Sequence, residues 1–184
     1  MPTNIEVKAR MTISHERAIE IALELSQSHI PEISTLIQED IFFHCNHGRL
    51  KLRRETQEDS ETAVLIAYER PDVVGPKRSD YVKTSIPEPD ELEDALTRSL
   101  GVKERVSKTR LLSIVERDGL KSRIHLDDVD GLGHFIEFEV LIDDEKDLEK
   151  GEEFAKYLCA AFNIKDGDHV DGAYVDAILD RSSL

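Results

Sequence analysis

Residues 4–10 read Asn-Ile-Glu-Val-Lys-Ala-Arg, and they alternate polar with apolar side chains. A period of two is typical of a β-strand, in which side chains i and i+2 project from the same face. Ile5 and Val7 therefore share one face, and Glu6 and Lys8 share the other. The stretch predicts a first strand with one apolar face and one charged face.

Strand-like segments recur along the rest of the chain and are separated by turn and helix signals. Asn-His-Gly at 46–48 and Asp-Gly at 118–119 indicate hairpins. The further predicted strands cover residues 39–44, 49–55, 62–70, 80–86, 102–116, 121–129 and 133–142, and the predicted helices cover 14–28, 89–100, 148–162 and 173–179. Strands, a helix, more strands and terminal helices together predict an antiparallel α+β domain whose long strands can close into a β-barrel with helices packed outside.

The composition limits the cellular setting and the partners. A length of 184 residues fits one domain, residues 1–184. The net charge of −15 disfavours DNA and acidic membrane surfaces, because a negative field repels polyanions. No stretch has the roughly 18 uninterrupted apolar residues that a membrane helix needs. Two distant cysteines suit a reducing compartment. We therefore expect a cytoplasmic protein, either monomer or homodimer.

Charged residues repeat on one face of strand after strand. One interpretation is an ordinary antiparallel sheet whose charged face is in solvent. However, the carboxylates gather on the first and last strands with the cations between them, which a solvated face does not require. If the apolar faces pack on outer helices, the charged faces line the barrel interior, which must then hold water, metal and an anion because unpaired buried charge is costly.

The charged residues divide into two sets with different chemistry. Carboxylate oxygens suit Mg²⁺ or Mn²⁺, and this set comprises Glu6, Asp127, Glu137 and Glu139. Guanidinium and ammonium groups suit the oxygens of a polyphosphate, and this set comprises Lys8, Arg49, Lys51, Arg53, Arg70, Lys83, Lys108, Arg110 and Arg123. The sequence therefore predicts a cavity that binds a metal ion together with a phosphate-rich small molecule.

Several blocks, taken in order, resemble the CYTH family of triphosphate tunnel metalloenzymes, which includes class IV adenylate cyclases and thiamine triphosphatases. The blocks are residues 4–10, Gly-Arg-Leu-Lys-Leu-Arg at 48–53, residues 68–72 and 78–81, Lys-Thr-Arg at 108–110, residues 123–139 and Gly-Ala-Tyr-Val-Asp at 172–176. The resemblance runs from Asn4 to about Leu179. It implies a closed eight-stranded tunnel, a triphosphate-containing substrate and dependence on Mg²⁺ or Mn²⁺. Asn4 stands where the broader family has a first glutamate, which leaves open whether one metal ion binds or two.

The resemblance implies roles for individual residues and a short range of reactions. Lys108 would stabilise or protonate the leaving oxygen, Glu6 would hold a second metal that activates water, and Tyr174 would close one mouth of the tunnel and contact the terminal phosphate. We expect hydrolysis of triphosphate compounds, inorganic triphosphate first. The alternatives are a class IV-type adenylate cyclase, a thiamine or nucleoside triphosphatase, and a non-catalytic polyphosphate-binding module. The lack of tryptophan disfavours adenine stacking.

Overall fold

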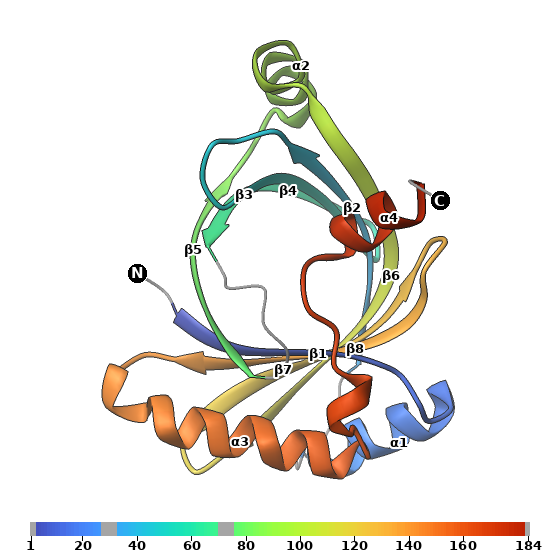
Figure 1. Ribbon diagram of the computed structural model, residues 1–184, viewed down its shortest axis with the longest axis vertical. Coiled ribbons are helices and arrows are strands. Elements are labelled where there is room, and N and C mark those ends of the chain that lie inside the picture. The colour runs from blue at the N-terminus through green and yellow to red at the C-terminus, as the bar shows by residue number, and fades with distance from the viewer. Residues whose placement is uncertain (1–2, 27–32, 70–75, 183–184) are drawn as a thin grey trace.

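The computed structural model describes residues 3–26, 33–69 and 76–182. Its eight strands form one closed antiparallel barrel in the order β1-β5-β4-β3-β2-β6-β7-β8 (Figure 1). The strands are β1 (Thr3–Arg10), β2 (Ser34–Phe43), β3 (Arg49–Gln57), β4 (Ser60–Glu69), β5 (Lys77–Ser85), β6 (Val102–Arg117), β7 (Leu120–Val129) and β8 (Gly133–Ile142). The predicted eight-stranded barrel is confirmed.

The barrel closes because the first strand pairs on both of its edges. β1 lies antiparallel to β5 on one side and to β8 on the other, with Glu6 opposite Glu139 and Lys8 opposite Glu137 in the second pairing. The 16-residue strand β6 joins the two halves of the ring, since it pairs with β2 and with β7. The first and last charged strands of the sequence are therefore neighbours.

Two helices cover one side of the ring, where the apolar strand faces point outward. These are α1 (His15–Leu25) and α3 (Leu148–Ala161), which lie against β1, β7 and β8 in Figure 1. Ile5, Val7 and Phe138 are buried beneath them in one apolar cluster. Burial of such side chains contributes about 25 cal/mol per Å² of apolar area. This cluster forces the alternate residues of the same strands, which are charged, to the inside of the barrel.

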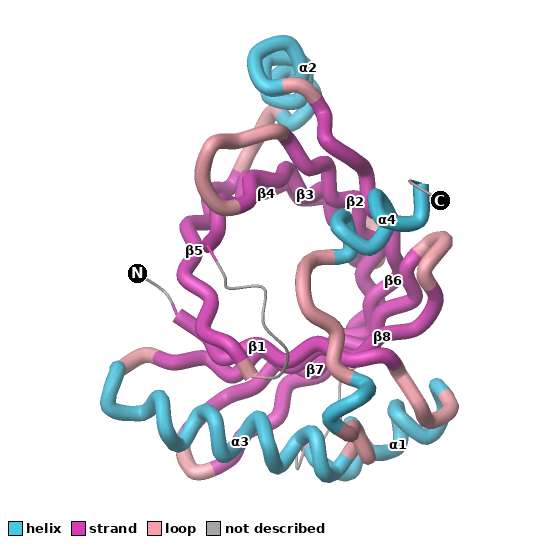
Figure 2. Tube along the Cα trace, viewed as in Figure 1, coloured by secondary structure: helices cyan, strands magenta, loops and turns pink. Residues whose placement is uncertain are grey.

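Two more helices lie over other parts of the ring. Leu92 and Leu96 of α2 (Pro89–Leu100) pack beside a buried cluster on β2 and β3. At one end of the barrel α4 (Tyr174–Ser182) contributes Tyr174 and Val175 to a third buried cluster. The segment before α4 crosses the open ring in the view of Figure 2. The short 3₁₀ turns at Glu145–Asp147 and Asp166–Asp168 complete the described elements.

Most predicted boundaries agree with the structure to within two residues, and four differ by more, among them the end of α4, which is at Ser182 rather than at residue 179. β2 begins at Ser34, five residues before its predicted start, and β5 begins at Lys77, three residues before its own. α1 ends at Leu25 rather than Ser28, and residues 27–32 are outside the described part of the chain. Both cysteines are free thiols, as expected. No described helix is long and apolar enough to span a membrane.

Candidate phosphate-binding site inside the barrel

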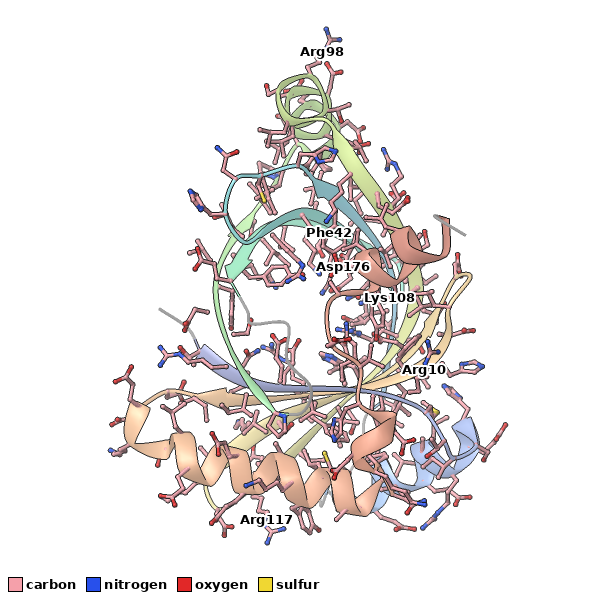
Figure 3. The ribbon with its side chains drawn as sticks, viewed as in Figure 1. Arg10, Phe42, Arg98, Lys108, Arg117 and Asp176 are labelled. Atoms are coloured by element: carbon pink, nitrogen blue, oxygen red, sulfur yellow. The ribbon has the colours of Figure 1, made fainter. Side chains whose placement is uncertain are left out.

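A cavity of about 190 Å³ lies inside the barrel. This volume has room for on the order of ten water molecules, so the charged groups around it need not be dry. Its lining comes from all eight strands and from the start of α4: Asn4, Glu6, Val7, Lys8, Asp40, Phe42, Lys51, Arg53, Ile66, Tyr68, Ser79, Tyr81, Lys83, Lys108, Arg110, Arg123, Glu137, Phe138, Glu139, Ala173 and Tyr174. In Figure 3, Phe42 and Lys108 lie within the ring, whereas Arg98 and Arg117 lie outside it.

The charge of the lining is opposite to that of the whole chain. Seven lysine and arginine side chains line the cavity against four carboxylates, while the chain as a whole carries −15. A cationic cleft with protein walls focuses the field on its own interior, even when the outer surface is acidic. The cavity therefore favours a small anion that can enter it.

Asp40 of β2 organises the cations of β3. It accepts hydrogen bonds from Lys51 Nζ at 2.8 Å and from Arg53 Nε and Nη2 at 2.6 and 2.8 Å. Burial alone would raise the pKa of Asp40, but the charges of Arg53 and Lys51 outweigh burial and hold that pKa well below its usual value. Asp40 is thus a permanent anion that keeps two neighbouring cations in fixed positions.

Arg110 of β6 is the centre of a second network on the other side of the cavity. Its guanidinium donates to both oxygens of Asp127 at 2.6 Å and to Glu137 Oε2 at 2.6 Å. Lys8 Nζ lies 3.0 Å from the other Glu137 oxygen. Burial raises the pKa of Glu137, but Lys8 and Arg110 outweigh it and hold that pKa well below normal. Glu137 is therefore ionised and shared by two cations.

Two lysines of the cavity, Lys51 and Lys108, have weakened basicity. Burial, and then the charge of Arg53, lowers the pKa of Lys51 to about 7. Burial, and then Arg110, lowers the pKa of Lys108 to about 8. Because the ammonium form is the one that is costly to bury, a bound anion would restore it. The protonation of these two lysines is consequently sensitive to pH near neutrality and to the presence of an anion.

The predicted metal ligands lie in two different settings. Glu6, Glu137 and Glu139 line the cavity from adjacent strands, and their hard oxygen atoms fit Mg²⁺ or Mn²⁺ by ligand chemistry. In the described structure Glu139 is paired with Arg123 at 3.1 Å, and no three acidic, histidine or cysteine side chains of that part converge to hold an ion. Asp127 is fully buried beneath Arg110 and is not part of the lining. Its role as a ligand stays a prediction.

The remaining predicted phosphate ligands are more peripheral. Lys83 lines the cavity but is exposed. Arg49 is outside the lining and donates to Asp176 Oδ2 of α4 at 2.9 Å. Arg70 is outside the described residues. With Lys83, the predicted cations that line the cavity are seven: Lys8, Lys51, Arg53, Lys83, Lys108, Arg110 and Arg123.

The sequence interpretation missed two carboxylates that hold cations of this site, Asp40 and Asp176, whereas it did place His125 on the inner face of its strand. Asp40 was overlooked, although it occupies the same face as Phe42 within a predicted strand, and period-two alternation alone would have found it. Asp176, which holds Arg49, had no such signal because it lies on a helix distant in the chain. His125 is buried with Nδ1 at 3.7 Å from Glu137 and 3.9 Å from Glu139. Burial, and then Arg110, lowers the pKa of His125.

A closed barrel with a net cationic cavity beside a group of carboxylates defines a polyphosphate-handling protein. The CYTH domain matches residues 2–174, and the chain therefore belongs to the CYTH family. Enzymes of this family handle triphosphates as adenylate cyclases or triphosphatases, and they typically use divalent metals.

Individual proteins are similar to this chain over most of its length. A candidate adenylate cyclase of Methanocaldococcus jannaschii, MJ0240, is 25% identical over 178 residues, which is 94% of this chain and 97% of the relative. The PH1819 protein of Pyrococcus horikoshii has the same fold, with a TM-score of 0.76, 21% identity and coverage of 97% of this chain and 99% of that one. A candidate adenylyl cyclase of Hippeastrum with dominant triphosphatase activity has a TM-score of 0.57 at 14% identity, over 92% and 91% of the two chains.

Proposed function

We propose that this protein is a metal-dependent phosphohydrolase that acts on triphosphate-containing substrates, with inorganic triphosphate as its preferred substrate. One observation carries the proposal: seven cationic side chains and four carboxylates line one cavity inside the barrel. Such a lining suits a compact polyanion with an accompanying metal ion. In this proposal residues 1–184 form the single domain that carries the activity.

Phosphoryl transfer gains mainly from positioning and charge stabilisation, and the cavity supplies both. Arg53 and Arg110 are held by carboxylates at hydrogen-bond distance, so their remaining N–H groups are oriented before a phosphate arrives. A guanidinium can donate two parallel hydrogen bonds to one phosphate. In this proposal these arginines bind the phosphate groups, and the lysines of the cavity act as mobile point charges.

Lys108 is the proposed proton donor to the leaving oxygen. Its ammonium lies 3.5 Å from Asp127 Oδ2, and its pKa of about 8 is close to neutral pH. A group with such a pKa is protonated in a large fraction of molecules and still gives up its proton readily. Its conjugate amine would be returned to the ammonium form by solvent after product release.

Glu6, Glu137 and Glu139 are the proposed metal-holding residues. A divalent ion, when bound, neutralises phosphate charge and lowers the pKa of a coordinated water molecule. Glu137 and Glu139 must then exchange their present contacts with Lys8, Arg110 and Arg123. That exchange would free the same cations for phosphate. The dominant triphosphatase activity of the Hippeastrum relative supports hydrolysis in this cavity.

A cyclase is the second candidate, and one wall of the cavity favours it. Ile66 of β4 and two tyrosines, Tyr68 and Tyr81, line the cavity, and these tyrosines are direct partners across β4 and β5. An apolar and aromatic wall can contact a nucleobase. The Methanocaldococcus relative also bears a cyclase name. In that reaction a ribose hydroxyl would replace water as the nucleophile.

Product analysis separates the candidates. The full-length protein is incubated with inorganic triphosphate, ATP and thiamine triphosphate in turn, each with Mg²⁺ and with Mn²⁺, and phosphate, pyrophosphate and cyclic AMP are measured. Phosphate release that is fastest from inorganic triphosphate supports the proposal. Cyclic AMP with pyrophosphate from ATP would establish the cyclase. Tight binding of triphosphate without any product would indicate a binding module.

A further inference from the structure

Two lysines of the cavity meet at one aromatic ring. Lys8 Nζ lies 3.7 Å from the centroid of the Tyr174 ring, and Lys108 Nζ lies 5.0 Å from the same centroid. Lys8 belongs to β1 and Lys108 to β6, which are separated in the barrel by β7 and β8. The aromatic group that both lysines share therefore comes from the C-terminal segment, residues 169–176.

This contact has a physical consequence for both lysines. An ammonium on a four-carbon chain is a mobile point charge, and two ammonium groups in one small cavity repel each other. The face of an aromatic ring carries negative quadrupole density and attracts a cation, most strongly where water is excluded. Lys8, Lys108 and Tyr174 are all buried. The ring therefore gives both ammonium groups a common attractive surface and limits where they can lie.

The ring is itself held in place on two sides. The Tyr174 hydroxyl donates to Asp127 Oδ2 at 3.0 Å, and Asp127 is anchored by Arg110. The ring also packs against Phe135 with centroids 5.0 Å apart and an interplanar angle of 63°. Edge-to-face packing of this kind is a favoured aromatic geometry. The Tyr174 ring is consequently a fixed surface rather than a mobile cover.

The backbone before Tyr174 is attached to the same lysine. His169 forms a β-bridge with Ala9, and the Val170 N–H donates to the Lys8 carbonyl at 2.9 Å. Lys8 is thus held twice by the C-terminal segment: at its carbonyl by Val170 and at its ammonium by Tyr174. On the far side Asp176 holds Arg49.

We infer that Tyr174 is a positioning residue of the phosphate site, which acts through Lys8 and Lys108 and does not itself contact the phosphate. The C-terminal segment then organises the cations as well as covering the barrel end. This inference rests on the proposed function, because it requires that the two lysines bind a polyphosphate. It replaces the contact between Tyr174 and the terminal phosphate that the family resemblance implied.

The test compares three variants of the full-length protein. Tyr174→Phe keeps the ring and removes the hydroxyl, and Tyr174→Leu removes the ring while retaining an apolar side chain. Val175→Ala is the matched control, since Val175 is the neighbouring residue in the same buried cluster and has no aromatic ring that could attract an ammonium group. Measurements are the affinity for inorganic triphosphate by calorimetry, KM and kcat, and the NMR shifts of lysine Cε protons, which a ring face moves upfield.

We expect Tyr174→Leu to weaken triphosphate affinity on the order of 10-fold, the loss of a desolvated cation–π contact, and to abolish the upfield lysine shifts. Tyr174→Phe should recover most of the affinity and retain the shifts. Val175→Ala should bind triphosphate like the wild type.

Equal losses in Tyr174→Leu and Val175→Ala would show that the residue only docks α4, and a Tyr174→Phe variant as impaired as Tyr174→Leu would assign the effect to the hydroxyl. Either result overturns the inference. Failure of the wild type to bind triphosphate would instead contradict the proposed function, and the NMR shifts would still report whether the ring contact exists.

Discussion

Asp40 is the buried carboxylate that holds the cations of β3, and its neutralisation is the most direct test of that role. In the Asp40→Asn variant the side chain keeps its shape, but it loses its charge and one of its acceptor atoms. The amide oxygen can then accept a hydrogen bond from Lys51 or from Arg53. The amide NH₂ group, which is itself a donor, faces the N–H groups of whichever cation is left. The two cations, which Asp40 now holds at 2.6–2.8 Å, would repel each other across a neutral group.

The magnitude follows from burial. Asp40 is 2% exposed, and removal of one member of a buried ion pair costs about 3–5 kcal/mol. We expect the lower end, about 3 kcal/mol, because the adjoining cavity has room for water that can solvate the remaining charges. For a chain of this size that loss lowers Tm by roughly 6–12 °C. Loss of the acidic partner also removes the attraction that keeps Lys51 protonated, so triphosphate binding should weaken at neutral pH.

Urea and thermal unfolding, followed by circular dichroism at pH 7, measure the change. Glu39→Gln is the matched control, since Glu39 is the adjacent residue and forms an exposed pair with Arg105 at 3.1 Å. Such a surface pair contributes less than about 1 kcal/mol. Added inorganic triphosphate should raise the Tm of Asp40→Asn less than that of the wild type, because the variant binds the anion more weakly. An Asp40→Asn variant as stable as the Glu39→Gln control would show that Asp40 does not hold these cations in place.

Glu139, Lys51 and Gly48 provide further tests. Glu139→Gln should abolish turnover and weaken Mn²⁺ binding while the circular dichroism spectrum is unchanged; wild-type activity would remove Glu139 from the metal site. In metal-free buffer the affinity for triphosphate should fall as pH rises through about 7, because Lys51, with its lowered pKa, loses its positive charge in that range. The Lys51→Arg variant stays charged, so its affinity measured by calorimetry should depend less on pH. In the unfolded chain Lys51 keeps its proton up to the ordinary lysine pKa, whereas in the folded protein it loses the proton near pH 7. Because the unfolded state then binds more protons, Lys51 makes the free energy of unfolding rise with pH above 7. Gly48→Ala should lower the free energy of unfolding by at least about 2 kcal/mol. The reason is that Gly48 has φ of +61° and a Cβ there would lie 2.5 Å from the Tyr68 carbonyl oxygen. Urea unfolding measures the change, and an unchanged midpoint would contradict the prediction.

Signals such as the alternation in residues 4–10 and the hairpin at Asp118–Gly119 predicted most of the strands correctly. These signals are local: a strand face is set by the two-residue repeat, and a tight turn needs residues that tolerate positive φ, as Asp118 and Gly119 do. The early start of β2 at Ser34 was missed because residues 34–38 lack a clear alternation of polar and apolar side chains. Pairing with β6, a strand far along the chain, extends β2 there.

Local pattern also placed the charged faces of Glu6, Lys8, Lys51 and Arg53 together, and the cavity lining contains all four. It could not assign ion-pair partners. Asp40 pairs with cations on β3, Glu137 with a cation on β1, and Asp176 with Arg49 on a strand 127 residues away. Each ion-pair partner is set by the register between strands or by the path of the C-terminal segment. The spacing of residues within one strand determines neither the register nor the path.

The order of the residues was enough to define most of the strands and the charged face of each, because these properties depend on neighbours within a few positions. The inward direction of the charged faces required the folded chain, since it follows from the burial of the opposite faces under α1 and α3. Barrel closure then made β1 and β8 adjacent and brought Tyr174 over Lys8 and Lys108. Such contacts join residues far apart in the chain, and their energy exists only after the loops between them have closed.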